Sequence, residues 1–161
     1  MFPFLFYLET SAIMYSITSI HDASQIKLPE LNSLLHQLNP DIKPIDQSHV
    51  EKIMCTDTIF LFGAFDESKK LIGMISVAIF PIPSGMRCWI EDIVVDRMHR
   101  GKGLGKKLMK HAIEYAQECG ALCIDLTSRP SRMEANEMYQ KMGFEKRETN
   151  VYRKYVASKE F

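Results

Sequence analysis

Residues 100–105 read Arg100-Gly101-Lys102-Gly103-Leu104-Gly105. Glycines at alternate positions leave a backbone with little side-chain obstruction, so several consecutive N–H groups can converge on one anion. Upstream lies an apolar, strand-like run at residues 90–95, and downstream Leu104, Leu108 and Ala112 recur at helical spacing. The glycines therefore stand at a helix N-terminus, where free N–H groups and the helix dipole both favour a phosphate. Strand, glycine-rich turn and helix together predict a pyrophosphate-binding site.

Two common phosphate loops differ from this pattern. A Walker loop ends in Gly-Lys followed by Ser or Thr, and neither Ser nor Thr follows Lys106 or Lys107. A Rossmann fingerprint needs Gly-x-Gly-x-x-Gly, whereas this loop has Gly-x-Gly-x-Gly in mid-chain. The pattern Arg100-x-x-Gly103-x-Gly105 instead resembles the acyl-CoA pyrophosphate loop of the GNAT family of N-acetyltransferases.

The resemblance implies acetyl-CoA as the co-substrate. It implies that the pantetheine arm pairs with the backbone of Ile93, Val94 and Val95 as an added strand. It also implies that the pyrophosphate is held by Arg100, Gly101, Lys102, Gly103, Leu104, Gly105 and Lys106.

Composition bounds the possible function classes. The chain has 161 residues, enough for one domain with its own core, and 46% of them are hydrophobic. Because 20 Lys and Arg balance 20 Asp and Glu, no global field favours nucleic acid or an anionic membrane. The apolar stretch from Phe2 to Leu8 is too short to span a membrane and lacks the basic start of a signal peptide. We expect residues 1–14 to be an N-terminal extension and residues 15–161 to form the domain.

The cysteines indicate neither a metal site nor a disulfide framework. They are Cys55, Cys88, Cys119 and Cys123, and no second Cys or His pair completes a zinc set. We expect small buried thiols, which are typical of a cytoplasmic protein.

Hydrophobic periodicity predicts a mixed α/β chain. Strands are expected at residues 15–20, 59–65, 71–80, 87–95, 122–127, 144–148 and 150–155. Helices are expected from Asp22 to Leu38 with a kink or break at Pro29, and at residues 46–54, 104–118 and 131–142. This order resembles the GNAT fold element by element over roughly residues 15–156. The resemblance implies an α/β (α+β) fold with a central mixed, mostly antiparallel sheet flanked by helices.

A second segment, residues 135–144, resembles the Ala-x-x-x-Tyr-x-x-x-Gly-Phe pattern that ends the last helix of GNAT enzymes. In that family the tyrosine, here Tyr139, points its hydroxyl at the sulfur of CoA. A thiolate forms when the acyl group leaves, and a nearby O–H can donate a proton or a hydrogen bond to it. The alternative is an aromatic residue on the core face of the helix, the role expected of Met138 and Met142.

Two carboxylates, Glu91 and Asp92, interrupt the apolar strand before the loop. Acyl transfer needs a neutral amine, yet an alkylammonium is protonated near pH 7, so a base must accept the proton. Neighbours on a strand face opposite ways, so at most one carboxylate faces a given cleft unless a bulge intervenes. The GNAT resemblance implies such a bulge. We therefore predict catalytic and substrate-binding roles for the pair.

The string Ile90-Glu91-Asp92-Ile93 also resembles glucosamine 6-phosphate N-acetyltransferases, which implies an amino-sugar phosphate as acceptor. Those enzymes usually continue the next strand with an acidic-lysine-asparagine turn, whereas this chain has a longer, basic turn at residues 127–132. Guanidinium and hydroxyl groups suit a substrate anion. The predicted anion-binding residues are Thr127, Ser128, Arg129 and Arg132. Contact of one arginine with the CoA phosphates, or solvation of both, is the alternative.

Together these features predict an acetyl-CoA-dependent N-acetyltransferase that acts by direct transfer. The expected partner is a small-molecule amine, best represented by glucosamine 6-phosphate, with no metal, nucleic acid or membrane, and the expected assembly is a homodimer. Acetylation of another small amine or of a protein N-terminus, and a CoA-binding module that has lost catalysis, are the alternatives.

Overall fold

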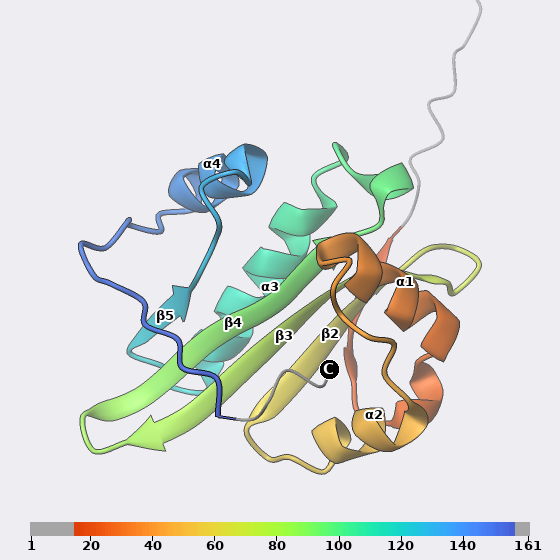
Figure 1. Cartoon of the computed structure of the whole chain (residues 1–161), viewed down its shortest axis with the longest axis horizontal. Helices are drawn as coiled ribbons and strands as arrows, with labels where there is room; N and C mark the ends of the chain where they lie inside the picture. The colour runs from red at the N-terminus through yellow and green to blue at the C-terminus, as the bar shows by residue number, and fades with distance from the viewer. Residues whose placement is uncertain (1–14, 157–161) are drawn as a thin grey trace, which may run out of the picture.

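A five-stranded sheet lies at the centre of the computed structural model, which describes residues 15–156 (Figure 1). The strands are β1 (Ser16–Ile20), β2 (Ile59–Phe65), β3 (Leu71–Ile82), β4 (Gly85–Val95) and β5 (Cys123–Leu126), and they lie side by side in chain order. Neighbouring strands from β1 to β4 run antiparallel, whereas β4 and β5 run parallel because a helix connects them. The predicted mixed, mostly antiparallel sheet is confirmed.

Helices cover both faces of this sheet (Figure 1). They are α1 (Leu28–Leu38), α2 (Gln47–Met54), α3 (Leu104–Glu118) and α4 (Met133–Lys141). Leu108 of α3 packs with Phe62 in one core cluster, while Leu34 of α1 and Val50 of α2 pack with Leu61 in the other. Because successive side chains on a strand point to opposite faces, Leu61 and Phe62 supply one residue to each core. α4 follows β5 along the chain.

A bulge interrupts β4 at the acidic pair. Glu91 pairs with Ser76 and Val94 pairs with Met74, so β4 carries one residue more than β3 between these pairs. Asp92 takes a left-handed conformation, with φ of 49°. The ladder between β4 and β5 ends before this point, so the two strands separate toward the glycine loop. The bulge implied by the family resemblance is confirmed.

The predicted helix from Asp22 is wrong in its first half. Asp22 caps a short 3-10 turn, η1 (Ala23–Gln25), and α1 begins only at Leu28. Pro29 lies in the first turn of α1, where the N–H that proline lacks would have no acceptor within the helix. Pro29 therefore starts the helix and does not kink it.

The two closing strands predicted at residues 144–148 and 150–155 are not formed. Every residue from 145 to 156 is exposed, and Val151 and Tyr152 are 72% and 88% exposed. The apolar residues of this segment have no sheet surface on which to be buried, so pairing would bring little hydrophobic stabilisation. An ion pair of 3.6 Å between Arg147 and Asp125 links the segment to β5. The expected extension at residues 1–14 lies outside the described residues.

Of the four cysteines one is buried, two are exposed, and Cys119 at the end of α3 is half-buried. Cys88 is buried as expected, and burial raises the pKa of its thiol to about 11. Cys55 and Cys123 are exposed, contrary to expectation, because Cys55 caps the end of α2 and Cys123 begins the short strand β5. Over residues 15–156, no group of three or more His, Cys, Asp or Glu side chains is placed to hold a metal ion. Over the same residues, no helix has the length and apolarity needed to cross a membrane.

Candidate active site

The predicted phosphate loop joins β4 to α3 and leaves room beside its backbone. Gly101 and Gly103 have φ of 75° and 74°, a left-handed conformation that glycine adopts without strain. A Cβ placed on either residue would meet no atom within 4 Å. Gly103 caps α3 and no side chain bonds to the first amides of the helix, so these amides and the helix dipole are available to an anion. The geometry fits a phosphate group.

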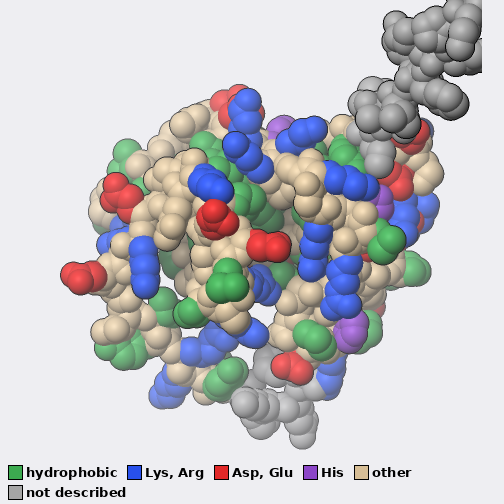
Figure 2. All heavy atoms as spheres, turned by 90° about the horizontal axis from the view of Figure 1, so that it is seen from above, with side chains coloured by type: hydrophobic (Ala, Val, Ile, Leu, Met, Phe, Trp, Pro, Cys, Tyr) green, Lys and Arg blue, Asp and Glu red, His purple; other side chains and the backbone are tan. Residues whose placement is uncertain are grey.

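A cavity of about 710 Å³ lies between this loop, β4, α1 and α4. Figure 2 views the molecule from this end, where Lys and Arg side chains border a hollow. Of the charged residues that line the cavity, Arg100, Lys106 and Arg132 are basic and Glu134 is acidic. Nine of the predicted cofactor-binding residues line it, and Lys102 does not: Ile93, Val94, Val95, Arg100, Gly101, Gly103, Leu104, Gly105 and Lys106. The two segments predicted to hold acetyl-CoA thus border one space.

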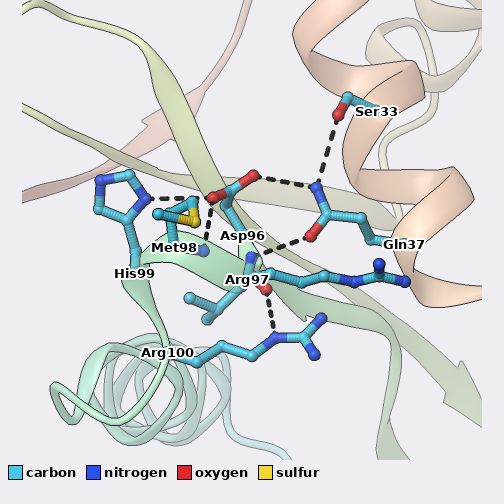
Figure 3. Close-up of polar contacts among 8 residues, drawn as sticks. Ser33, Gln37, Asp96, Arg97, Met98, His99 and Arg100 are labelled. Atoms are coloured by element: carbon cyan, nitrogen blue, oxygen red, sulfur yellow. Dashed lines mark hydrogen bonds and ion pairs between the residues drawn. The ribbon is translucent and has the colours of Figure 1, made fainter.

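Side-chain hydrogen bonds hold the turn η2 (Arg97–His99), which precedes the loop (Figure 3). Asp96 Oδ1 accepts from the Met98 amide at 2.9 Å and lies 3.3 Å from His99 Nδ1. From α1, Gln37 Nε2 donates to Asp96 Oδ2 at 2.9 Å, and Gln37 Oε1 accepts from the Arg97 amide at 2.9 Å. Partial burial opposes ionisation of Asp96, but these hydrogen bonds hold its pKa below the usual value.

Sequence reasoning missed Gln37 and Leu38, which line the cavity from the last turn of α1. A single glutamine on an amphipathic helix far from the loop carries no motif that could have singled it out. At the loop itself, Arg100 turns back so that its Nε donates to the Val95 carbonyl at 2.9 Å. This bond ties the start of the loop to the end of β4 (Figure 3).

Tyr139 lies on α4, where it lines both the large cavity and a smaller one of about 390 Å³. Tyr139 is only 7% exposed, and its ring packs edge-on against the ring of Phe144, with the two ring centroids 5.9 Å apart. Burial raises the pKa of the phenol, although the charge of Arg132 opposes the shift. The hydroxyl is therefore protonated at neutral pH and can donate to a leaving thiolate.

The acidic pair lies at the bulge, and neither carboxylate lines either of these two cavities. The indole Nε1 of Trp89 donates to Glu91 Oε1 at 2.7 Å, which fixes the direction of that carboxylate. Both Glu91 and Asp92 keep contact with solvent. Even so, the protein atoms crowded around the bulge and the charge of Glu91 raise the pKa of Asp92. A raised pKa makes Asp92 a stronger proton acceptor than an ordinary aspartate.

The donors predicted on the turn at residues 127–132 are spread over different places. Arg132 lines the large cavity and donates its Nη2 to the Leu38 carbonyl at 2.8 Å. Ser128 lines the smaller cavity, and its buried Oγ has no hydrogen-bond partner within residues 15–156. Thr127 and Arg129 are exposed and line neither cavity. The structure therefore does not bring the four together, and Arg132 instead ties α4 to the end of α1.

Comparison with known proteins places this arrangement in a family. The profile of the Acetyltransferase (GNAT) family matches residues 28–144. Streptothricin acetyltransferase of Streptomyces lavendulae is 45% identical over 58 residues, which make up 36% of this chain and 31% of that protein. This relative and two further curated relatives are each matched over only 26–45% of their length.

Solved structures of acetyltransferases share the fold. Glucosamine-6-phosphate N-acetyltransferase from Arabidopsis thaliana has a TM-score of 0.76 at 24% identity, over 89% of this chain and 99% of that one. An aminoglycoside N-acetyltransferase solved in complex with CoA has a TM-score of 0.75 at 19% identity, over 93% and 100% of the two chains. The match of the family profile to residues 28–144 shows that the chain belongs to the Acetyltransferase (GNAT) family.

Proposed function

We propose that the chain is an N-acetyltransferase that uses acetyl-CoA and transfers the acetyl group directly to a primary amine. One observation carries the proposal: the open glycine loop at the N-terminus of α3 and the buried phenol of Tyr139 border the same cavity. A ligand with its phosphates at the loop can extend along the cavity toward the tyrosine. Membership of the acetyltransferase family supports this assignment.

Acetyl-CoA supplies an activated thioester, whose acetyl group passes to the amine as an N–C bond forms and the C–S bond breaks. The loop amides and the α3 N-terminus bind the pyrophosphate, and Arg100 and Lys106 add positive charge beside it. Beyond the bulge, β4 no longer pairs with β5, so the edge of β4 on that side is open. The pantetheine amides can pair with this edge along Ile93, Val94 and Val95, where the Val95 carbonyl also accepts from Arg100 Nε.

Two proton transfers complete the reaction. The incoming ammonium loses its proton to Asp92, through water where the distance requires it, and Glu91 orients the amine. The raised pKa of Asp92 suits this role, because a stronger base takes the proton more readily. At the other end, Tyr139 donates its proton to the departing sulfur and regains one from solvent.

For the acceptor we propose an amino-sugar phosphate, with glucosamine 6-phosphate as the test compound. The acidic pair of β4 supports it, and so does the structural likeness to the Arabidopsis protein that carries this name. Arg129, exposed on the turn before α4, is the guanidinium proposed for the phosphate. A second candidate is another small polar amine, favoured by the relatives named for streptothricin and for aminoglycosides.

The test is CoA thiol release at saturating acetyl-CoA, with glucosamine 6-phosphate, glucosamine, spermidine and a peptide N-terminus as separate acceptors. The proposal expects amine-dependent release and a product heavier by one acetyl group. Stoichiometric CoA binding with no release for any amine would indicate a non-catalytic binding module. Transfer to spermidine or to the peptide, and not to the sugar, would overturn the acceptor while leaving the reaction in place.

A further inference from the structure

Gln37 uses both ends of its side-chain amide on the connection between β4 and the glycine loop (Figure 3). Its Nε2 donates to Asp96 Oδ2 and its Oε1 accepts from the Arg97 amide, each at 2.9 Å. The bonds join residues that are 59 and 60 positions apart in the chain. One side chain thus ties α1 to the turn from which the loop begins.

The two bonds act where the chain leaves the sheet. Asp96 still extends the pairing of β4 with β3, because its amide donates to the Ile72 carbonyl of β3 at 2.8 Å. Its Oδ1 meanwhile accepts from the Met98 amide and so shapes η2, which leaves Oδ2 for Gln37. Without Gln37, the carboxylate loses one of its donors and the Arg97 amide loses its acceptor. The direction in which the chain enters the loop depends on both groups.

We propose that Gln37 is a positioning residue that fixes the Asp96–Arg97 connection and thereby aims the loop amides at the pyrophosphate. The inference rests on the proposed function of the loop. Amides that bind an anion are effective only when they are held in place before the ligand arrives, and small displacements weaken binding strongly. Gln37 is half-buried and lines the same cavity as the loop, so its bonds are partly shielded from water.

The chain offers a matched control on the same helix. Asn32 also uses both ends of its amide on one distant backbone position. Its Nδ2 donates to the Ile45 carbonyl at 3.0 Å, and its Oδ1 accepts from the Ile45 amide at 2.8 Å. Asn32 is half-buried as well, but it holds the connection to α2 and does not line the cavity. Gln37→Met and Asn32→Leu therefore remove the same kind of interaction, and only the first acts on the loop.

The first measurement is amide hydrogen exchange of the full chain without ligand. Gln37→Met should speed exchange at residues 96–99, whose amides all have acceptors, by about tenfold, since it opens the connection locally and leaves the core packed. Asn32→Leu should leave these residues as in the wild type and affect residues near Ile45 instead. Exchange at residues 96–99 that is the same in Gln37→Met and in the wild type would overturn the inference.

The second measurement compares two donors that differ at the pyrophosphate. With acetyl-CoA, Gln37→Met should lower kcat/KM by about tenfold, and with S-acetylpantetheine, which has no pyrophosphate, it should change little. Asn32→Leu should leave the ratio between the donors unchanged. An equal loss with both donors would overturn the inference, because it would mean general damage to the site. Failure of the wild type to bind CoA would overturn the proposed function instead, and hydrogen exchange would still decide whether Gln37 holds the turn.

Discussion

Gly103 and Gly120 form a natural pair for testing where the cofactor binds. Their φ angles are 74° and 75°, and a Cβ on either would meet no atom within 4 Å. They differ in location, because Gly103 lines the cavity before α3 and Gly120 follows the end of that helix. Gly103→Val and Gly120→Val therefore introduce the same backbone strain, and only the first places atoms beside the loop amides.

The expected magnitudes separate stability from binding. A left-handed conformation costs an L-residue about 1–2 kcal/mol, which in a domain of this size lowers Tm by about 2–8 °C. Both variants should therefore fold. If Gly103→Val displaces two charge-assisted bonds from amides to phosphate, at about 1.5–3 kcal/mol each, Kd for CoA rises at least about 100-fold. Gly120→Val should bind CoA as the wild type does.

Scanning calorimetry gives the two Tm values, and titration calorimetry with CoA gives the affinities. Equal CoA affinity in the two variants would refute the placement of the phosphate at the loop. An unfolded Gly103→Val beside a folded Gly120→Val would refute the strain argument, because the two positions share one backbone geometry.

Four further substitutions test individual side chains. Tyr139→Phe removes the proton donor and should lower kcat by about 10²–10⁴-fold at unchanged CoA affinity; if chemistry limits turnover and kcat is unchanged, Tyr139 only packs. Asp92→Asn should slow transfer yet raise Tm at pH 7. The pKa of Asp92 in the folded protein is raised above 3.8, the value of an unperturbed aspartate, so the wild type loses stability as the pH rises from 3.8 through the folded pKa. If the Tm of Asp92→Asn depends on pH as the wild-type Tm does, that result would speak against this account. Arg129→Ala should reduce kcat/KM for glucosamine 6-phosphate and not for glucosamine. Arg132→Ala removes the hydrogen bond to the Leu38 carbonyl and should reduce kcat/KM for both sugars. An equal effect of Arg129→Ala on both sugars would show that Arg129 does not bind the phosphate.

Local signals made much of the fold predictable. The hairpin of β2 and β3 follows from two apolar runs around a polar turn, and α3 forms at residues 104–118 as its spacing predicts. The glycine loop was recognisable because positive φ angles and an open backbone both require glycine. The bulge at Asp92 was expected only because the sequence resembles the GNAT family, and the pairing of β4 with β3 confirms it.

The failures came where tertiary contacts decide. From sequence alone, a proline within a helical pattern predicts a break. Once the start of α1 is known, Pro29 lies in the first turn of the helix, where proline is favourable. The alternating residues after Phe144 predict strands, but a strand forms only where a sheet edge and a core accept it. Arg132 suits an anion by its chemistry, yet the fold brings the Leu38 carbonyl within its reach. Gln37 acts across the chain through a contact that no local pattern encodes.

Glycine amide signals in a nitrogen-15 NMR titration with CoA test the central claim most directly. The account predicts large shifts for Gly101, Gly103 and Gly105, which border the cavity, and little change for Gly120 and Gly143, which do not. The Kd fitted to these chemical-shift changes should equal the Kd from calorimetry. Shifts confined to Gly120 or Gly143, or a saturated complex in which the three loop glycines do not move, would contradict the account.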